Sequence, residues 1–135
     1  MKLIESRRES YKTSKNLLIS FQYAFNGIYY VFKTSRNFKI QLIFGLISLM
    51  LGFLFQISKS NYLILIVTIM SVLILEILNS SIESIVDLVV KKEFNNLAKI
   101  SKDTSAGAVL LASINSVIIG VYIFIPKIKL LFLNL

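Results

Sequence analysis

Three long apolar stretches constrain this chain more than any other feature. They cover residues 40–57, 62–90 and 106–125, and a helix needs about 20 apolar residues to cross the hydrocarbon core of a bilayer. Hydrophobic residues make up 56% of the chain and charged residues only 16%, which is far from the balance of a soluble domain. The 135 residues suit one domain. We therefore predict a single all-α integral membrane domain over residues 1–135, with three transmembrane helices.

The second apolar stretch is longer than one membrane crossing requires. As a helix of roughly 29 residues it would be about 43 Å long, at about 1.5 Å per residue, so it should cross the bilayer and protrude by a few turns. Lys and Arg are concentrated before the first stretch and between the second and the third, and these residues mark the cytoplasmic side. The N-terminus and the protruding end are therefore predicted to be cytoplasmic. Pro126 should end the third helix.

The segment before the first stretch has the pattern of an amphipathic helix. Its apolar residues at helical spacing are Leu17, Leu18, Phe21, Phe25, Ile28, Tyr29 and Phe32, and Lys12, Lys15, Asn16, Gln22, Asn26 and Lys33 fall mostly elsewhere around the helix. Two interpretations stay open for this basic segment, residues 1–39: a helix lying in the membrane interface, and a helix packed on the bundle.

The net charge of +8 bears on the partners of the chain. In so apolar a chain it favours anionic lipid headgroups, and not nucleic acid, as the partner surface. The ordinary excess of Lys and Arg on the cytoplasmic side of membrane proteins would also explain it.

Carboxylates inside the second stretch are the main chemical signal. The segment LEILNSSIESIVDLVV, residues 75–90, contains Glu76, Glu83 and Asp87, and charged side chains near a bilayer core are costly and usually functional. At about 100° per residue, these three and Asn79 fall within an arc of roughly 80° on a helix. Amides and hydroxyls could simply join helices, but three carboxylates repel one another and require a cation, a proton or donors. An ion or proton path and a site for a divalent metal with a phosphate ester both remain open.

Lys102 and Asp103 provide a second signal. They stand just before the small residues 106–108, where we expect the third helix to start, and a helix N-terminus beside a lysine attracts anions. Asp103 or Thr104 could instead be a simple N-cap. Together with the carboxylates, the pair suits a phosphate and its metal. The chain has no histidine and no cysteine, so acid–base chemistry would depend on carboxylates and lysines.

Two motifs in the chain resemble the prokaryotic diacylglycerol kinase family, which includes undecaprenol kinases. They are E-x-x-N-x-x-I-E-x-x-V-D at residues 76–87 and A-K-x-x-K-D-x-x-A-G-A-V-L-L at residues 98–111. SFQYAFNGI at residues 20–28 and RNFKIQ at residues 36–41 are also similar. The resemblance implies a homotrimer in a bacterial plasma membrane, in which each chain has an N-terminal surface helix and three transmembrane helices.

The same resemblance implies a reaction and roles for individual residues. The γ-phosphate of ATP, with Mg²⁺ as cofactor, would pass to the hydroxyl of diacylglycerol, giving phosphatidic acid, or of undecaprenol, giving undecaprenyl phosphate. Glu76 would be the general base, Asn79 would orient the reacting groups, and Glu83 would bind the metal that bridges the phosphates. The residues implied to hold the nucleotide are Asp87, Lys102 and Asp103, with Tyr23, Glu93 and Asn95 near it.

Three positions depart from the family pattern. Where the family often has a metal-binding Glu immediately before Arg-Asn, this chain has Ser35, and a serine hydroxyl is a poor magnesium ligand beside a carboxylate. The metal would be helped by Ser35, keep more water or use another side chain, or the activity would be weak. Many relatives have histidine in place of Gln41 and Asn95. We expect an active lipid kinase; the alternatives are a small oligomeric ion- or proton-conducting protein and a structural membrane protein.

Overall fold

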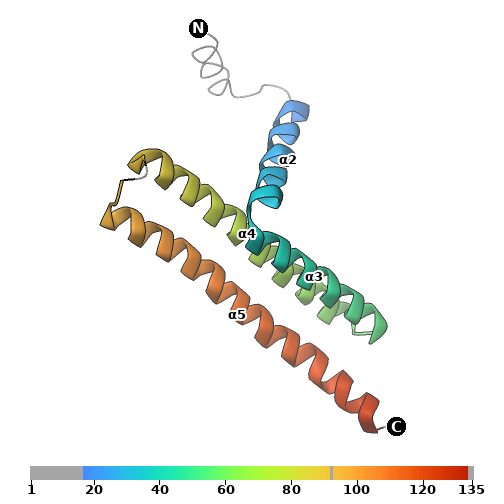
Figure 1. The fold of residues 1–135 in the computed structure, drawn as a ribbon. Helices are drawn as coiled ribbons and strands as arrows, with labels where there is room; N and C mark the ends of the chain where they lie inside the picture. Colours follow the sequence, from blue (N-terminus) through green and yellow to red (C-terminus); the bar gives the residue numbers. More distant parts are fainter. Residues whose placement is uncertain (1–16, 92, 134–135) are drawn as a thin grey trace.

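The computed structural model describes residues 17–91 and 93–133, and helices account for nearly all of them. The helices are α2 (Leu17–Thr34), α3 (Arg36–Leu54), α4 (Lys59–Val90) and α5 (Asn96–Leu133), with no strand within those ranges (Figure 1). This confirms the predicted all-α class. Lys12, Lys15 and Asn16, which belong to the predicted amphipathic pattern, lie outside the described residues.

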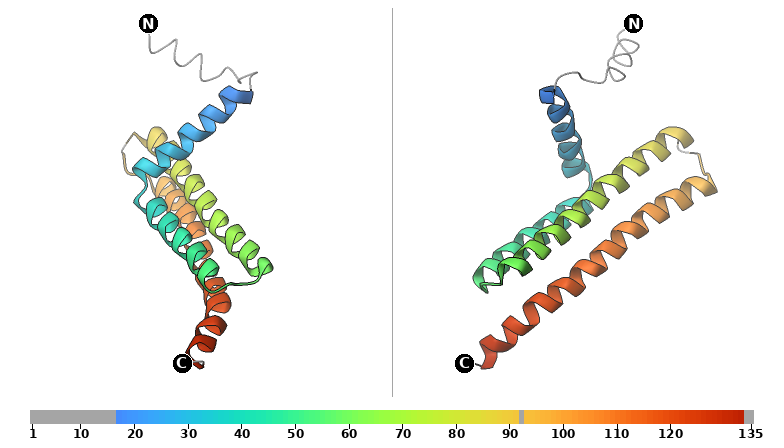
Figure 2. Two further views of the ribbon diagram at one scale, coloured as in Figure 1. Left: turned by 90° about the vertical axis from the view of Figure 1, so that its right-hand side faces the viewer. Right: turned by 180° about the vertical axis from the view of Figure 1, so that it is seen from behind.

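Three of the helices, α3, α4 and α5, are long and apolar enough to cross a membrane, so the chain is an integral membrane protein. α4 and α5 run side by side in opposite directions, and α3 lies along the N-terminal half of α4 (Figure 2). The connection between α4 and α5 lies at one end of the bundle, and the turn between α3 and α4 at the other (Figure 1). Most side chains of the bundle face outwards, as expected where lipid or another chain replaces water.

Close packing of α3 against α4 depends on glycine. Gly45 is buried, and a Cβ built on it would lie 2.7 Å from Cγ2 of Ile69 on α4. Nearer the turn, the Tyr62 hydroxyl donates to the Leu49 carbonyl at 3.1 Å. The two backbones can therefore approach closely enough to carry the residues of α3 to the polar face of α4.

The N-terminal end of α5 differs from the prediction. The helix begins at Asn96, because Asn95 acts as its N-cap: Asn95 Oδ1 accepts from the backbone N–H groups of Leu97, at 2.9 Å, and Ala98, at 3.2 Å. A start just before residue 106 is therefore wrong. Asp103 and Thr104 are not N-caps, because they lie well inside the helix.

The C-terminal end of α5 differs as well. The helix continues through Pro126 to Leu133, so the prediction that Pro126 ends it is wrong. A proline removes one backbone hydrogen bond from a helix. Membrane helices tolerate this loss, since neighbouring groups and small local adjustments satisfy the freed carbonyl.

Helix α2 leaves the bundle at an angle. One residue, Ser35, separates it from α3, and α2 points away from α4 and α5 in all three views (Figures 1 and 2). Val31, near its C-terminal end, is the buried residue of α2 and packs with Phe38 and Leu73. Most of the apolar side chains of α2 are exposed. Both interpretations of this segment, a helix lying in the membrane interface and a helix packed on the bundle, stay predictions.

Candidate active site

Glu76, Asn79, Glu83 and Asp87 share one face of α4, called the polar stripe below. Glu76 is its most buried member, with 2% of its surface exposed. The Ser35 hydroxyl donates to Glu76 Oε1 at 2.7 Å, and the Gln41 amide donates to Oε2 at a longer 3.4 Å. Ser35 is the N-cap of α3, and Gln41 lies in the second turn of that helix. The start of α3 thus supplies donors to both oxygens of one buried carboxylate.

Asn79, one turn further along α4, joins the stripe to α5. Its Nδ2 donates to Glu83 Oε1 at 3.1 Å, and its Oδ1 accepts from the Ser105 hydroxyl at 2.6 Å. Asn79 is 7% exposed, and buried amides of this kind need partners for both ends. The Asn79 side chain therefore fixes one oxygen of Glu83 and the spacing between the two helices.

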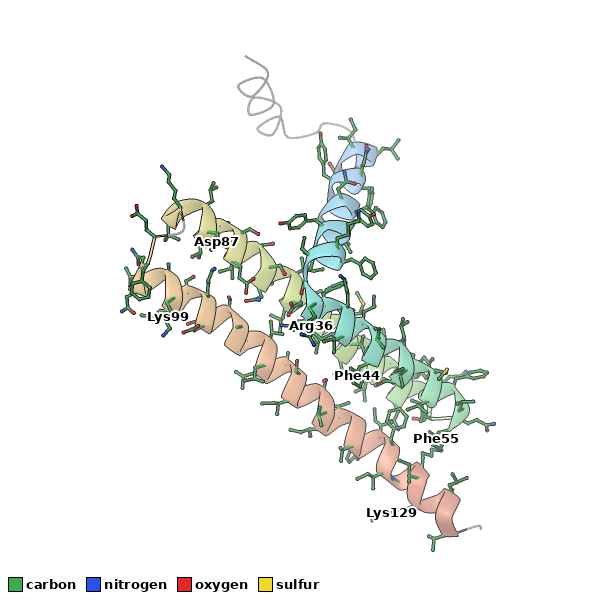
Figure 3. All side chains as sticks on the ribbon, viewed as in Figure 1. Arg36, Phe44, Phe55, Asp87, Lys99 and Lys129 are labelled. Atoms are coloured by element: carbon green, nitrogen blue, oxygen red, sulfur yellow. The ribbon has the colours of Figure 1, made fainter. Side chains whose placement is uncertain are left out.

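Asp87 and Lys102 form an ion pair between α4 and α5, with Lys102 Nζ 2.6 Å from Asp87 Oδ1. Both side chains are accessible to solvent. The pair lies towards the end of the bundle where α4 connects to α5, the end at which Asp87 and Lys99 are labelled in Figure 3. Lys102 reaches Asp87 because it lies two turns inside α5. The sequence had predicted that Lys102 lies just before the N-terminus of this helix.

A polar pocket of about 390 Å³ lies along the stripe. Glu76, Asn79, Glu83 and Asp87 line one side of it, and the other side comes from the junction of α2 and α3, which includes Arg36. Arg36 is labelled at that junction in Figure 3. The polar stripe therefore faces a cavity that is large enough for a phosphate ester.

A second pocket, of about 400 Å³, adjoins the first because Asp87 lines both. It lies at the connection between α4 and α5. Five of the residues assigned to the nucleotide by resemblance line it: Asp87, Glu93, Asn95, Lys102 and Asp103. Tyr23 lines neither of these pockets; it lies on α2 and is 61% exposed. Within one chain, the structure thus brings together all of the predicted nucleotide residues of α4, α5 and their connection, but not Tyr23.

The carboxylates fit a magnesium ion that arrives with a nucleotide. Among the described residues, no group of three or more acidic side chains is arranged to hold a metal by itself. Mg²⁺ is commonly bound through one or two carboxylates together with substrate phosphates and water. Glu83 and Asp87 line the same polar pocket, which meets that requirement. The role of Ser35 in metal binding stays a prediction.

An apolar groove of about 470 Å³ runs between α3, α4 and α5. Phe44, Val72 and Val117 are among the residues that line it, one from each helix, and Gln41 is one of its polar lining residues. The Gln41 Oε1 atom is buried and has no hydrogen-bond partner among the described residues. Because Gln41 Nε2 donates to Glu76, the groove leads to the buried carboxylate.

Three side-chain contacts in the site were not predicted from the sequence. Ser35 and Gln41 depart from the family pattern in the sequence, but nothing in the sequence indicates that both donate hydrogen bonds to Glu76. Ser105 carried no signal, because a serine in an apolar helix usually bonds its own backbone. A serine directly before a helical pattern is a recognisable N-cap, and that signal could have located the Ser35 hydroxyl at the start of α3.

Comparison with known proteins gives one matching family model and two similar kinases. Residues 22–124 match the family model described as prokaryotic diacylglycerol kinase. A Synechocystis protein named diacylglycerol kinase is 42% identical over 120 residues, which cover 89% of this chain and 69% of that protein. A Bacillus subtilis protein named undecaprenol kinase is 40% identical over 108 residues, which cover 80% of this chain and 87% of that protein. The matched region includes α3, α4, residues 22–34 of α2 and nearly all of the apolar part of α5.

Proposed function

This chain belongs to the prokaryotic diacylglycerol kinase family and is a lipid kinase, and we propose that it transfers the γ-phosphate of ATP to the hydroxyl of a membrane lipid. The observation that carries the proposal is the buried carboxylate of Glu76, which lies where the polar pocket and the apolar groove approach each other. The polar pocket suits phosphates and the groove suits a lipid tail. A base between them can reach the hydroxyl of a lipid at the interface.

In the proposed reaction, the lipid hydroxyl oxygen attacks the γ-phosphorus of ATP. A new O–P bond forms, the bond from the γ-phosphorus to the bridging oxygen breaks, and ADP leaves. The hydroxyl proton passes to Glu76. In the structure, the two oxygens of this carboxylate accept from the Ser35 hydroxyl and the Gln41 amide.

The nucleotide would occupy the pocket at the connection between α4 and α5, with its phosphates extending into the polar pocket past Asp87. Lys102 supplies positive charge for the phosphates, and Asp103 and Asn95 offer polar groups for the rest of the nucleotide. Glu83 would hold the magnesium ion, which when bound neutralises charge on the phosphates.

The acceptor would place its tail in the apolar groove and its hydroxyl near Gln41, beside the Glu76 carboxylate that takes the hydroxyl proton. Diacylglycerol and undecaprenol both present a hydroxyl on an apolar tail, and the two relatives carry one name each. Both acceptors therefore belong to the proposal. No observation favours the ion-conducting or the structural alternative.

We propose further that the kinase is a homotrimer in a bacterial plasma membrane, with α2 and the α4–α5 connection on the cytoplasmic side, near ATP and anionic headgroups. The resemblance to the family and the excess of Lys and Arg before α3 and between α4 and α5 support this assembly and orientation. Cross-linking in native membranes should end at a species of three chains. A ladder that stops at two would contradict the trimer.

The test of the proposed function is transfer of labelled γ-phosphate by purified protein with Mg²⁺, with diacylglycerol and undecaprenol offered side by side. We expect one labelled lipid product from the wild-type protein and about a hundredfold less from Glu76→Gln, the smaller end of the usual contribution of a general base. The amide keeps the shape of the side chain but cannot take the proton. Gel filtration and thermal unfolding in detergent check that the variant is folded. Equal transfer by the variant and the wild type would show that Glu76 is not the base. No transfer to either lipid by well-folded wild-type protein would contradict the proposal that diacylglycerol or undecaprenol is the acceptor.

A further inference from the structure

The Ser35 side chain has two partners that belong to different helices. Its oxygen accepts the backbone N–H of Phe38 at 3.1 Å, which caps α3, and its proton goes to Glu76 Oε1 on α4 at 2.7 Å. The contact with Glu76 joins residues 41 positions apart in the chain. A serine hydroxyl has one proton and two lone pairs, so these two bonds use the proton and one lone pair.

The backbone holds this hydroxyl in place from both sides. Ser35 N–H donates to the Val31 carbonyl at 2.8 Å, which ties the residue to the last turn of α2. Its own φ of −84° and ψ of 119° are the extended conformation usual for an N-cap. The hydroxyl therefore keeps its position without relying on a flexible side chain, since serine has a single χ angle to fix.

From this geometry we propose that Ser35 is a positioning residue for the base. Its hydroxyl, locked by the cap of α3, fixes the Glu76 carboxylate in the orientation that receives the proton of the lipid hydroxyl. The inference rests on the proposed function, because it assumes that Glu76 is the base. It assigns Ser35 a role in the rate of transfer, exerted through Glu76, and no role in magnesium binding.

The alternative is that Ser35 replaces the family's metal-binding Glu. A metal role would need a free lone pair of the hydroxyl to face Glu83, whereas the bonds in the structure orient the proton towards Glu76. The two roles differ in what they change. A metal ligand sets the Mg²⁺ concentration needed for half of the maximal rate, and a positioning residue sets kcat once all substrates are bound.

The experiment measures kcat, the lipid KM and the half-saturating Mg²⁺ concentration for Ser35→Ala, Ser35→Gly and Ser35→Thr. Glycine is nearly as good an N-cap as serine, whereas alanine is poor, so Ser35→Gly removes the donor while keeping the helix start. Threonine retains the hydroxyl. Ser58→Ala is the matched control, because Ser58 caps α4 in the same way, accepting from the backbone N–H of Asn61.

We expect Ser35→Ala and Ser35→Gly to lower kcat about tenfold through the lost orientation of Glu76, with the lipid KM and the half-saturating Mg²⁺ concentration unchanged. Ser35→Thr should recover most of the wild-type kcat, and Ser58→Ala should keep it. If Ser35→Gly has the wild-type kcat, or if Ser58→Ala loses as much, the inference is overturned. A loss that saturating Mg²⁺ repairs would assign Ser35 to the metal instead. Failure of the proposed function is separate, since it would appear as no transfer, or no effect of Glu76→Gln, in otherwise wild-type protein.

Discussion

At the scale of single residues, some contacts in the site can be predicted from the sequence and others cannot. Glu76, Asn79 and Glu83 share one face of α4 because their spacing follows the helical repeat, and the structure gathers them along one pocket. The Ser35 bond to Glu76 crosses 41 positions. No local pattern encodes such a contact, because it depends on how closely α3 approaches α4.

The ion pair of Asp87 and Lys102 allows a prediction that separates binding from stability. Both partners are solvent-accessible, and exposed ion pairs contribute little to folding stability because water screens the charges. Lys102→Met should therefore leave the thermal unfolding temperature nearly unchanged, yet raise the KM for ATP about tenfold through the loss of a charge facing the phosphates.

The matched control for that charge is Lys59→Met, at the opposite end of α4. It removes the same charge far from both polar pockets, so the KM for ATP should stay at the wild-type value. Steady-state kinetics over a range of ATP concentrations would measure both variants. Equal KM values for Lys102→Met and the wild type would exclude Lys102 from nucleotide binding.

At the scale of elements, helix type was predictable and helix ends were less so. The apolar stretches gave the existence of α3, α4 and α5, since a span of about 20 apolar residues is a strong signal. The polar run before residue 106 concealed the true start of α5, because Asn95 caps a helix whose first turns are hydrophilic. The predicted end of α5 at Pro126 was wrong for another reason. The rule that a proline ends a helix holds for soluble proteins, whereas membrane helices tolerate proline.

The contact of α3 with α4 gives a prediction at this scale. Gly45→Ala would place its Cβ 2.7 Å from Ile69 Cγ2, and such overpacking typically costs about 1–3 kcal/mol. We expect the variant to unfold at lower temperature in detergent and to lose activity, because Ser35 and Gln41 move away with α3.

Gly120→Ala is the control for the glycine contact. A Cβ on Gly120 of α5 meets no described atom within 4 Å, and alanine favours a helix by roughly 0.5–1 kcal/mol over glycine. Its stability should therefore equal or exceed that of the wild type. If both alanine variants unfold alike, close packing at Gly45 is not what holds α3 against α4.

At the scale of the whole molecule, the orientation in the membrane can be tested directly, because the chain has no cysteine. Single cysteines placed by Lys59→Cys and Lys99→Cys lie at opposite ends of α4 and α5, where both lysines are exposed. A thiol reagent that cannot cross membranes, applied to intact cells, should label Lys59→Cys and spare Lys99→Cys. The reverse labelling would mean that the nucleotide pocket faces away from ATP.

The joint between α2 and α3 has a mechanical consequence. One residue, Ser35, connects the two helices, and that residue also donates to Glu76. Tilting α2 at the membrane surface therefore turns the donor as well, because no slack chain separates the two. With Ser35 in its proposed role, lateral pressure and headgroup crowding that tilt α2 would change the orientation of the Glu76 carboxylate through this one residue. The rate of phosphate transfer would then depend on the physical state of the bilayer.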